Sequence, residues 1–140
     1  MKAKLLKLMV GAVSLLACGM LFSGCEDEDT TSDISATRFH VERALTSYDG
    51  TDTYNWDTTL SQAGFTVQIK DFRAGDAAIS VYDERGKVLL SAALVTRDYT
   101  VYLGDNEFVR TGRTAIGAPG HWTVRLSYNQ FSGDQKVTME

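Results

Sequence analysis

The sequence lacks cysteine beyond position 25, and this absence removes several kinds of chemistry at once. The two cysteines are Cys18 and Cys25, so the chain that follows them can form no disulfide, no thiolate metal site and no cysteine nucleophile. A domain after Cys25 must therefore be stabilised by an apolar core. The segment 34–140 is long enough to build one.

Catalytic motifs are missing as well. The sequence contains no Gly-x-Ser-x-Gly elbow, no glycine-rich phosphate loop and no His-Glu-x-x-His pair. Its two histidines, His40 and His121, are far apart in the sequence, and nothing in their spacing predicts that they meet. His40 alternates with apolar neighbours, so it should point to the polar face of a strand. We expect two surface histidines and no enzymatic activity.

Positive charge is scarce and unevenly placed. Fourteen Lys and Arg residues stand against 18 Asp and Glu residues, and the net charge of −4 gives no support to nucleic-acid binding. Three lysines, Lys2, Lys4 and Lys7, fall at the very start of the chain, whereas the segment 26–33 contains five acids and no base. From position 34 onward the chain carries 11 bases and 13 acids, which predicts a nearly neutral domain.

The N-terminus has the parts of an export signal. A basic segment, residues 1–7, precedes an uncharged apolar stretch, residues 8–22, and the small pair Ser23-Gly24. As a helix the apolar stretch would be roughly 22 Å long, shorter than the ~30 Å hydrocarbon core, so a permanent membrane-spanning helix is the weaker interpretation. We therefore expect residues 1–24 to be a signal peptide.

The residues that end this segment, Leu21-Phe22-Ser23-Gly24-Cys25, resemble the lipobox of bacterial lipoproteins. The resemblance implies that Cys25 carries covalent lipid and that the signal is cut before it. Leu15-Leu16-Ala17-Cys18 is a competing match, and an ordinary secretory signal with Cys25 as a free thiol is a further alternative. Acyl chains on Cys25 would anchor the protein to a membrane.

The acidic run after Cys25 predicts a disordered tether over residues 25–33, because like charges repel and no apolar side chain offsets the entropy of ordering. The run also resembles the surface-export signal of lipoproteins in Bacteroidota-type bacteria. That resemblance implies a lipid-anchored protein of the bacterial cell envelope, at the outer membrane, with its periplasmic or outer face left open. A simpler interpretation of the acidic run is that it is only a solvated linker.

Residues 34–140 form the predicted domain, in which apolar and polar residues alternate as in half-buried strands. Segment 39–48 could instead be a short amphipathic helix, and the more continuously apolar 88–94 should be a central strand. Turn-forming residues, including 83–87, 104–106, 117–120 and 132–134, separate the strands. We expect an all-β antiparallel sandwich or jelly roll of about seven to eight strands. The strand segments are 39–41, 54–60, 65–70, 77–82, 88–94, 99–103, 122–128 and 137–139.

Three motifs in this domain also carry a resemblance: Ile79-Ser80-Val81-Tyr82-Asp83-Glu84-Arg85-Gly86, Gly120-His121-Trp122-Thr123-Val124-Arg125-Leu126 and Phe131-Ser132-Gly133. Their order is similar to that of the bacterial pre-peptidase C-terminal domain, a small β-sandwich appended to exported proteins. The similarity covers the larger part of the predicted domain, from Phe65 onward. It implies an accessory or binding module.

The candidate ligand site is the segment from Tyr48 to Asp57, expected as a loop. Its exposed aromatics would be Tyr54 and Trp56, which next to acids suit stacking on a sugar. Three acids, Asp49, Asp52 and Asp57, could instead bind Ca²⁺, although their spacing matches no EF-hand loop. In the plainest alternative the aromatics enter the core and the acids make a turn.

The sequence thus predicts a small envelope lipoprotein that acts as a non-catalytic accessory or protein-interaction module. A glycan- or calcium-binding module displayed at the surface is the alternative. No cofactor is expected beyond the lipid on Cys25 and the possible Ca²⁺. The partner, an envelope protein or a glycan, stays open.

Overall fold

The structure is a computed structural model, and it describes residues 30–96 and 107–140. The signal peptide, Cys25, the strand expected at 99–103 and the turn expected at 104–106 lie outside the described residues. In the described part every regular element is a β-strand: β1 (Thr30–Ser35), β2 (Arg38–Thr58), β3 (Gly64–Tyr82), β4 (Val88–Val95), β5 (Phe108–Arg113) and β6 (Gly120–Met139). No helix there is long and apolar enough to cross a membrane.

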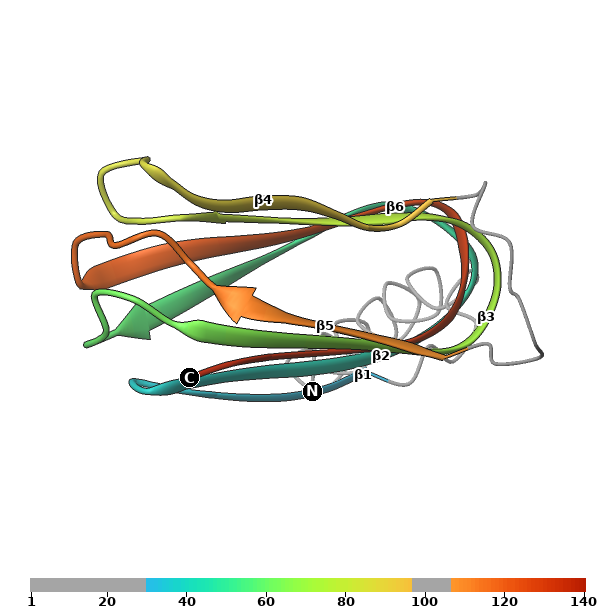
Figure 1. Ribbon diagram of the computed structural model, residues 1–140, viewed down its shortest axis with the longest axis horizontal. Helices are drawn as coiled ribbons and strands as arrows, with labels where there is room; N and C mark the ends of the chain where they lie inside the picture. Colours follow the sequence, from blue (N-terminus) through green and yellow to red (C-terminus); the bar gives the residue numbers. More distant parts are fainter. Residues whose placement is uncertain (1–29, 97–106) are drawn as a thin grey trace, which may run out of the picture.

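All pairings are antiparallel, in the order β1-β2-β6-β3-β4, with β5 on the first part of β3. Three long strands, β2, β3 and β6, run along one layer, curve together at one end and return in the other layer (Figure 1). The lower layer in that view holds β1, β5 and one half of each long strand, and the upper layer holds β4 and the other halves. The all-β antiparallel sandwich is therefore confirmed. Its described part contains six strands because each long strand serves both layers.

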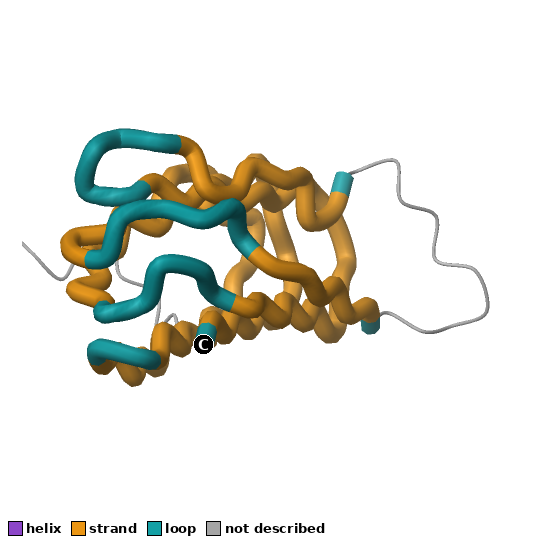
Figure 2. Tube along the Cα trace, turned by 60° about the vertical axis from the view of Figure 1, so that its left-hand side comes forward, coloured by secondary structure: helices purple, strands orange, loops and turns teal. Residues whose placement is uncertain are grey.

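The long strands bend where their backbone leaves the extended conformation. Ser47 in β2, Asp71 in β3 and Gln130 in β6 have φ values of 46°, 49° and 49°, in the left-handed region. Register shifts in the ladders of β2 with β6 and of β3 with β6 fall at the same level, which is how bulges turn a sheet. The described connections lie at the opposite end of the molecule (Figure 2).

The core lies between the two layers and is built on aromatic contacts. Trp56 of β2 and Trp122 of β6 are opposite each other in register and fully buried, with ring centroids 5.4 Å apart in an edge-to-face arrangement. Their indole N–H groups donate to the Ser35 and Ala118 carbonyls at 2.6 and 2.7 Å. The alternation of residues 122–128 predicted that Trp122 and Val124 lie on the buried face of their strand. Both are fully buried, so this prediction is confirmed.

Several sequence-based expectations are corrected. Residues 30–33, expected in the disordered tether, belong to β1 and pair with residues 40–43 of β2. Residues 132–134, expected as a turn, lie inside β6, and 137–139 end the same strand rather than forming a separate one. Among the described strands, the segment 88–94 lies at an edge, because β4 pairs there with β3 alone. Segment 39–48 is strand, as favoured over a helix.

Gly75 tests the importance of the bend. Its φ is +91°, and a Cβ atom there would overlap the Gln130 carbonyl of the adjacent strand. We expect Gly75→Ala to lower the free energy of unfolding by roughly 3 kcal/mol or more, because backbone strain and a backbone clash add. Gly86→Ala is the matched control: φ is +78°, but nothing lies within 4 Å of the added Cβ. Its cost should be only the left-handed strain of about 1–2 kcal/mol. Urea unfolding of both variants measures the difference, and equal losses would contradict the packing at the bend.

Candidate functional site

The candidate ligand segment is strand throughout: the strand expected at 54–60 is present as far as Thr58, and the preceding residues, expected as a loop, belong to the same strand. Residues 48–57 lie within β2, and their second half pairs residue by residue with β6. Trp56 is fully buried, and Tyr54 is half-buried with its ring 5.6 Å from Phe39. The sugar-stacking alternative, with both aromatics exposed on one patch, is therefore wrong, and the plainer alternative is right in that the aromatics enter the core. The aromatics enter the core because alternation within the strand turns both of them inward.

The three acids of this segment do not converge. The Asp49 carboxylate accepts two hydrogen bonds from Gln130, one from its backbone N–H at 2.7 Å and one from its side-chain amide. The side chain of Asp52 turns inward and that of Asp57 outward, where it lies 2.5 Å from Nδ1 of His121. Over residues 30–96 and 107–140, no three His, Cys, Asp or Glu side chains are placed to hold a metal ion. These acids therefore form separate side-chain pairs and no shared calcium site.

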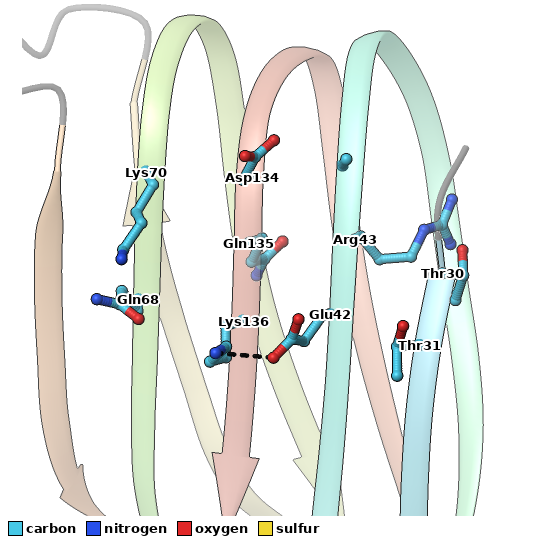
Figure 3. A pocket seen from close by; sticks show the side chains of 10 residues that line it. Thr30, Thr31, Glu42, Arg43, Gln68, Lys70, Asp134, Gln135 and Lys136 are labelled. Carbon is cyan, nitrogen blue, oxygen red and sulfur yellow. Dashed lines mark ion pairs between the residues drawn. The ribbon is translucent and has the colours of Figure 1, made fainter. Parts of the chain in front are cut away.

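A charged face covers the outer side of the lower layer. We give this name to the outward side chains Glu42, Gln68, Lys70, Asp134 and Lys136, which three neighbouring strands place side by side (Figure 3). These side chains and Ala44 line a hollow of about 440 Å³, and the remaining lining residues are Thr30 and Thr31 of β1, Arg43 and Gln135. No aromatic residue lines this hollow.

Both lysines of this face are paired with acids, Lys136 with Glu42 and Lys70 with Glu107. The Lys136 ammonium donates to the Glu42 carboxylate at 2.7 Å, and His40 lies 3.0 Å from the same oxygen. These two partners, Lys136 first, hold the pKa of Glu42 below its usual value. His40 also contacts the Thr138 hydroxyl at 2.8 Å. His40 thus points to the polar face as predicted, and it lies in the opposite layer from His121.

Polar side chains also lie inside the sandwich, near the bend. Arg43 and Asp52 face each other across the layers at 2.5 Å, and the Tyr48 hydroxyl donates to Asp52 at 3.0 Å. Burial raises the pKa of Tyr48 and, more strongly, that of Tyr128. The amide of Gln135 is 2 % exposed, and neither its oxygen nor its nitrogen has a hydrogen-bond partner within the described residues. Sequence reasoning missed this cluster, because contacts between the layers depend on where the strands bend.

A second hollow, of about 320 Å³, lies on the outer side of the upper layer. We call it the Tyr82 hollow, because the ring of Tyr82 borders it together with Arg125, whose guanidinium carbon is 5.3 Å from the ring centroid. Thr123 is opposite Tyr82 in register, and His121 lies on the same strand as Thr123. The turn after β3 supplies the remaining lining residues, Asp83, Glu84 and Gly86.

Asp83 organises the rim of the Tyr82 hollow. Its side chain accepts from the backbone N–H groups of Arg85 and Lys87, both at 2.9 Å, and from that of Ala118 at 3.0 Å. The residue is 5 % exposed. These bonds, led by the one from Ala118, lower the pKa of the carboxyl. One buried acid therefore ties together two connections that are distant in sequence. The only sequence signal for it was an Asp at the start of a turn that ends in glycine.

Comparisons with known proteins identify no family. No family model and no curated protein matches the sequence. Among solved structures, a carbohydrate-binding module, TmCBM61 in complex with β-1,4-galactotriose, is 14 % identical with a TM-score of 0.42, over 78 % of this chain and 65 % of that one. The enzymatically active domain of tailspike protein 4 from bacteriophage CBA120 is 12 % identical with a TM-score of 0.37, over 82 % and 17 % of the two chains. This chain thus spans less than two thirds of either structure. The lipobox and pre-peptidase resemblances stay predictions.

The pH dependence of stability tests the role of Asp83. Because the folded-state pKa lies below the ordinary value of 3.8, the carboxylate stabilises the fold above that pH and its contribution is lost as the pH falls toward the folded-state pKa. We expect Tm to decrease on acidification below about pH 4. Asp83→Asn should lower Tm by several degrees at pH 7 and flatten the acid limb. Thermal melts between pH 2 and 7 measure both, and unchanged melts in the variant would contradict this role.

Gln135 provides a test of the interior cluster. Gln135→Met has nearly the same volume and removes two buried polar atoms that lack partners in the described chain. We expect the free energy of unfolding to rise by about 1–2 kcal/mol. Gln68→Met, at a partly exposed position whose side chain donates to Glu107 at 2.5 Å, is the control and should change stability little. Denaturant unfolding gives both values. A loss of stability in Gln135→Met would show that the amide has a bound partner such as water.

Proposed function

We propose that this chain is a non-catalytic binding module of the bacterial cell envelope, anchored to the outer membrane by lipid on Cys25. The observation that carries the proposal is how the domain joins the predicted anchor. β1 begins at Thr30, shortly after Cys25 in the sequence, and lies at the outer edge of the lower layer. An anchor at this edge leaves the outer sides of both layers available to a partner.

The short connection also limits the position of the domain. The chain from Cys25 to Thr30 spans at most about 18 Å, so the sandwich would be held close to the membrane surface. The tether is shorter than the acidic composition suggested, because residues 30–33 are paired in β1. Such a module suits a partner that lies in or near the same membrane.

Side-chain chemistry supports binding over catalysis. General acid catalysis by a carboxyl group calls for a raised pKa, whereas Glu42 and Asp83 both have lowered pKa values. The two histidines are held by hydrogen bonds in opposite layers, His40 to Glu42 and Thr138, and His121 to Asp57. The Thr138 hydroxyl does lie beside His40, the pairing that a nucleophile and its base need, so the non-catalytic proposal rests on the carboxyl groups and not on the histidines.

The charged face supports a protein partner in particular. Acids and bases alternate on it, so a partner with the complementary pattern would be oriented by several charge pairs at once. Its existing ion pairs, Lys136 with Glu42 and Lys70 with Glu107, are about half exposed. Exposed pairs of this kind contribute only about 0–1 kcal/mol to stability, so they can exchange partners at low cost.

The two cysteines allow a matched test of the anchor. In a bacterial host that processes lipoproteins, Cys25→Ala should release the protein from membranes and remove labelling by an alkyne fatty acid. Cys18→Ala should leave both unchanged, because Cys18 is removed with the signal. Fractionation by centrifugation and gel fluorescence measure the two effects.

The reverse pattern, with labelling lost only in Cys18→Ala, would move the anchor to Cys18. Membrane retention of both variants without label would overturn lipidation altogether. Protease treatment of intact cells then distinguishes the two faces of the outer membrane.

A further inference from the structure

The Tyr82 hollow holds the one described aromatic side chain that is not part of the core. Every other aromatic residue in the described chain belongs to the buried cluster or packs against it. Tyr82 alternates with the buried Val81, so its ring points to the outer side of the upper layer. The ring borders a hollow of about 320 Å³ among polar side chains, and the guanidinium carbon of Arg125 lies 5.3 Å from its centroid.

The polar groups around this ring supply both donors and acceptors. Arg125 and His121 can donate, the Glu84 carboxylate can accept, and the Thr123 hydroxyl can do both, while Asp57, outside the lining, contacts Nδ1 of His121. The lining of the hollow holds one guanidinium, that of Arg125, and two carboxylates, those of Glu84 and Asp83, the second already bonded to three backbone N–H groups, so the hollow disfavours an anionic ligand. Its chemistry suits a neutral ligand with several hydroxyl groups.

The rim of the hollow is held in place before any ligand arrives. Asp83 fastens the turn after β3 to the backbone of Ala118. Gly120 has φ +132°, and a Cβ atom there would overlap the Glu84 carboxylate, so glycine lets that side chain lie across the strand end. The His121 backbone N–H approaches the same carboxylate at 3.4 Å. A rim ordered in this way lowers the entropic cost of binding.

We propose that the Tyr82 hollow is a saccharide-binding site, in which a sugar ring packs its C–H face on Tyr82 and its hydroxyls bond to Arg125, Glu84 and Thr123. A phenol ring presents an apolar face of the size of a pyranose, and the flanking groups match adjacent hydroxyls. The inference rests on the proposed role as a binding module and names the class of ligand. It places the sugar site on β3 and β6 instead of the segment 48–57, whose aromatics are buried.

The hollow of the charged face offers a natural comparison. It is larger, at about 440 Å³, but no aromatic residue lines it, and the stacking half of sugar recognition is missing there. A saccharide should therefore bind on the upper layer, and the charged face should stay unaffected.

NMR titration of the full chain in detergent tests the proposal. The probes are methyl β-D-glucoside, methyl β-D-galactoside, methyl α-D-mannoside and N-acetyl-D-glucosamine, with glycerol as a control that has hydroxyls but no ring. Single sugars are small ligands, so we expect dissociation constants on the order of 1–10 mM for at least one of them. Amide shifts should gather at residues 82–86 and 120–125, and glycerol should cause none.

Variants then separate stacking from hydrogen bonding. Tyr82→Ala should weaken binding at least tenfold, whereas Tyr82→Phe, which keeps the ring, should bind within about threefold of the unmodified chain. Lys136→Ala, on the charged face, should bind unchanged.

The proposal is overturned by an absence of saturable shifts for all four sugars, by shifts centred on residues 42–44 and 134–136, or by equal binding in Tyr82→Ala. None of these outcomes would contradict the proposed lipid anchor, because that proposal is tested separately by membrane release of Cys25→Ala. Conversion of a sugar during the titration, visible in its own proton spectrum, would instead contradict the non-catalytic role.

Discussion

The structure depends on the pairing of β6 with β2 on one side and β3 on the other along almost its whole length. Because all three strands pass through the bend together, the two layers are halves of one hydrogen-bonded sheet. This continuity brings Phe39 and Trp56, which lie toward opposite ends of the same strand, to a ring separation of 5.8 Å. The core, the interior polar cluster and both outer faces follow from this folding of one sheet onto itself.

Alternation in the sequence predicted the β class and the buried side of most strands, because burial follows period two whether a strand is long or short. The long strands could not be predicted. Their bends fall at Ser47, Asp71 and Gln130, residues that also occur in ordinary strands and turns, and neighbouring strands are needed to hold them left-handed. Gly133 was likewise expected in a turn, because the sequence alone does not distinguish a glycine inside a bent strand from one in a turn.

For the candidate site too, the sequence predicted less than the strand pairing determines. Residues 48–53 have the composition of a polar loop, yet pairing with β6 makes them one strand with the predicted segment that follows, in which Trp56 is buried. Tyr82 and Arg125 are distant in the sequence, and only the register of β3 against β6 brings them together. Pairing therefore decides which aromatics are available to a ligand, and composition alone does not. The buried Asp83 then holds the two connections beside Tyr82 together. The same hydrogen bonds therefore stabilise the fold and order the rim of the proposed sugar site.

Hydrogen exchange of the β6 amides measures most directly whether the two layers are one cooperative sheet. If they are, amides in both halves of β6, such as Val124 and Val137, exchange with the same free energy, equal to that of global unfolding. Protection of one half at that level, with exchange of the other half at a clearly lower free energy, would contradict the single-sheet account by showing that the layers open independently at the bend.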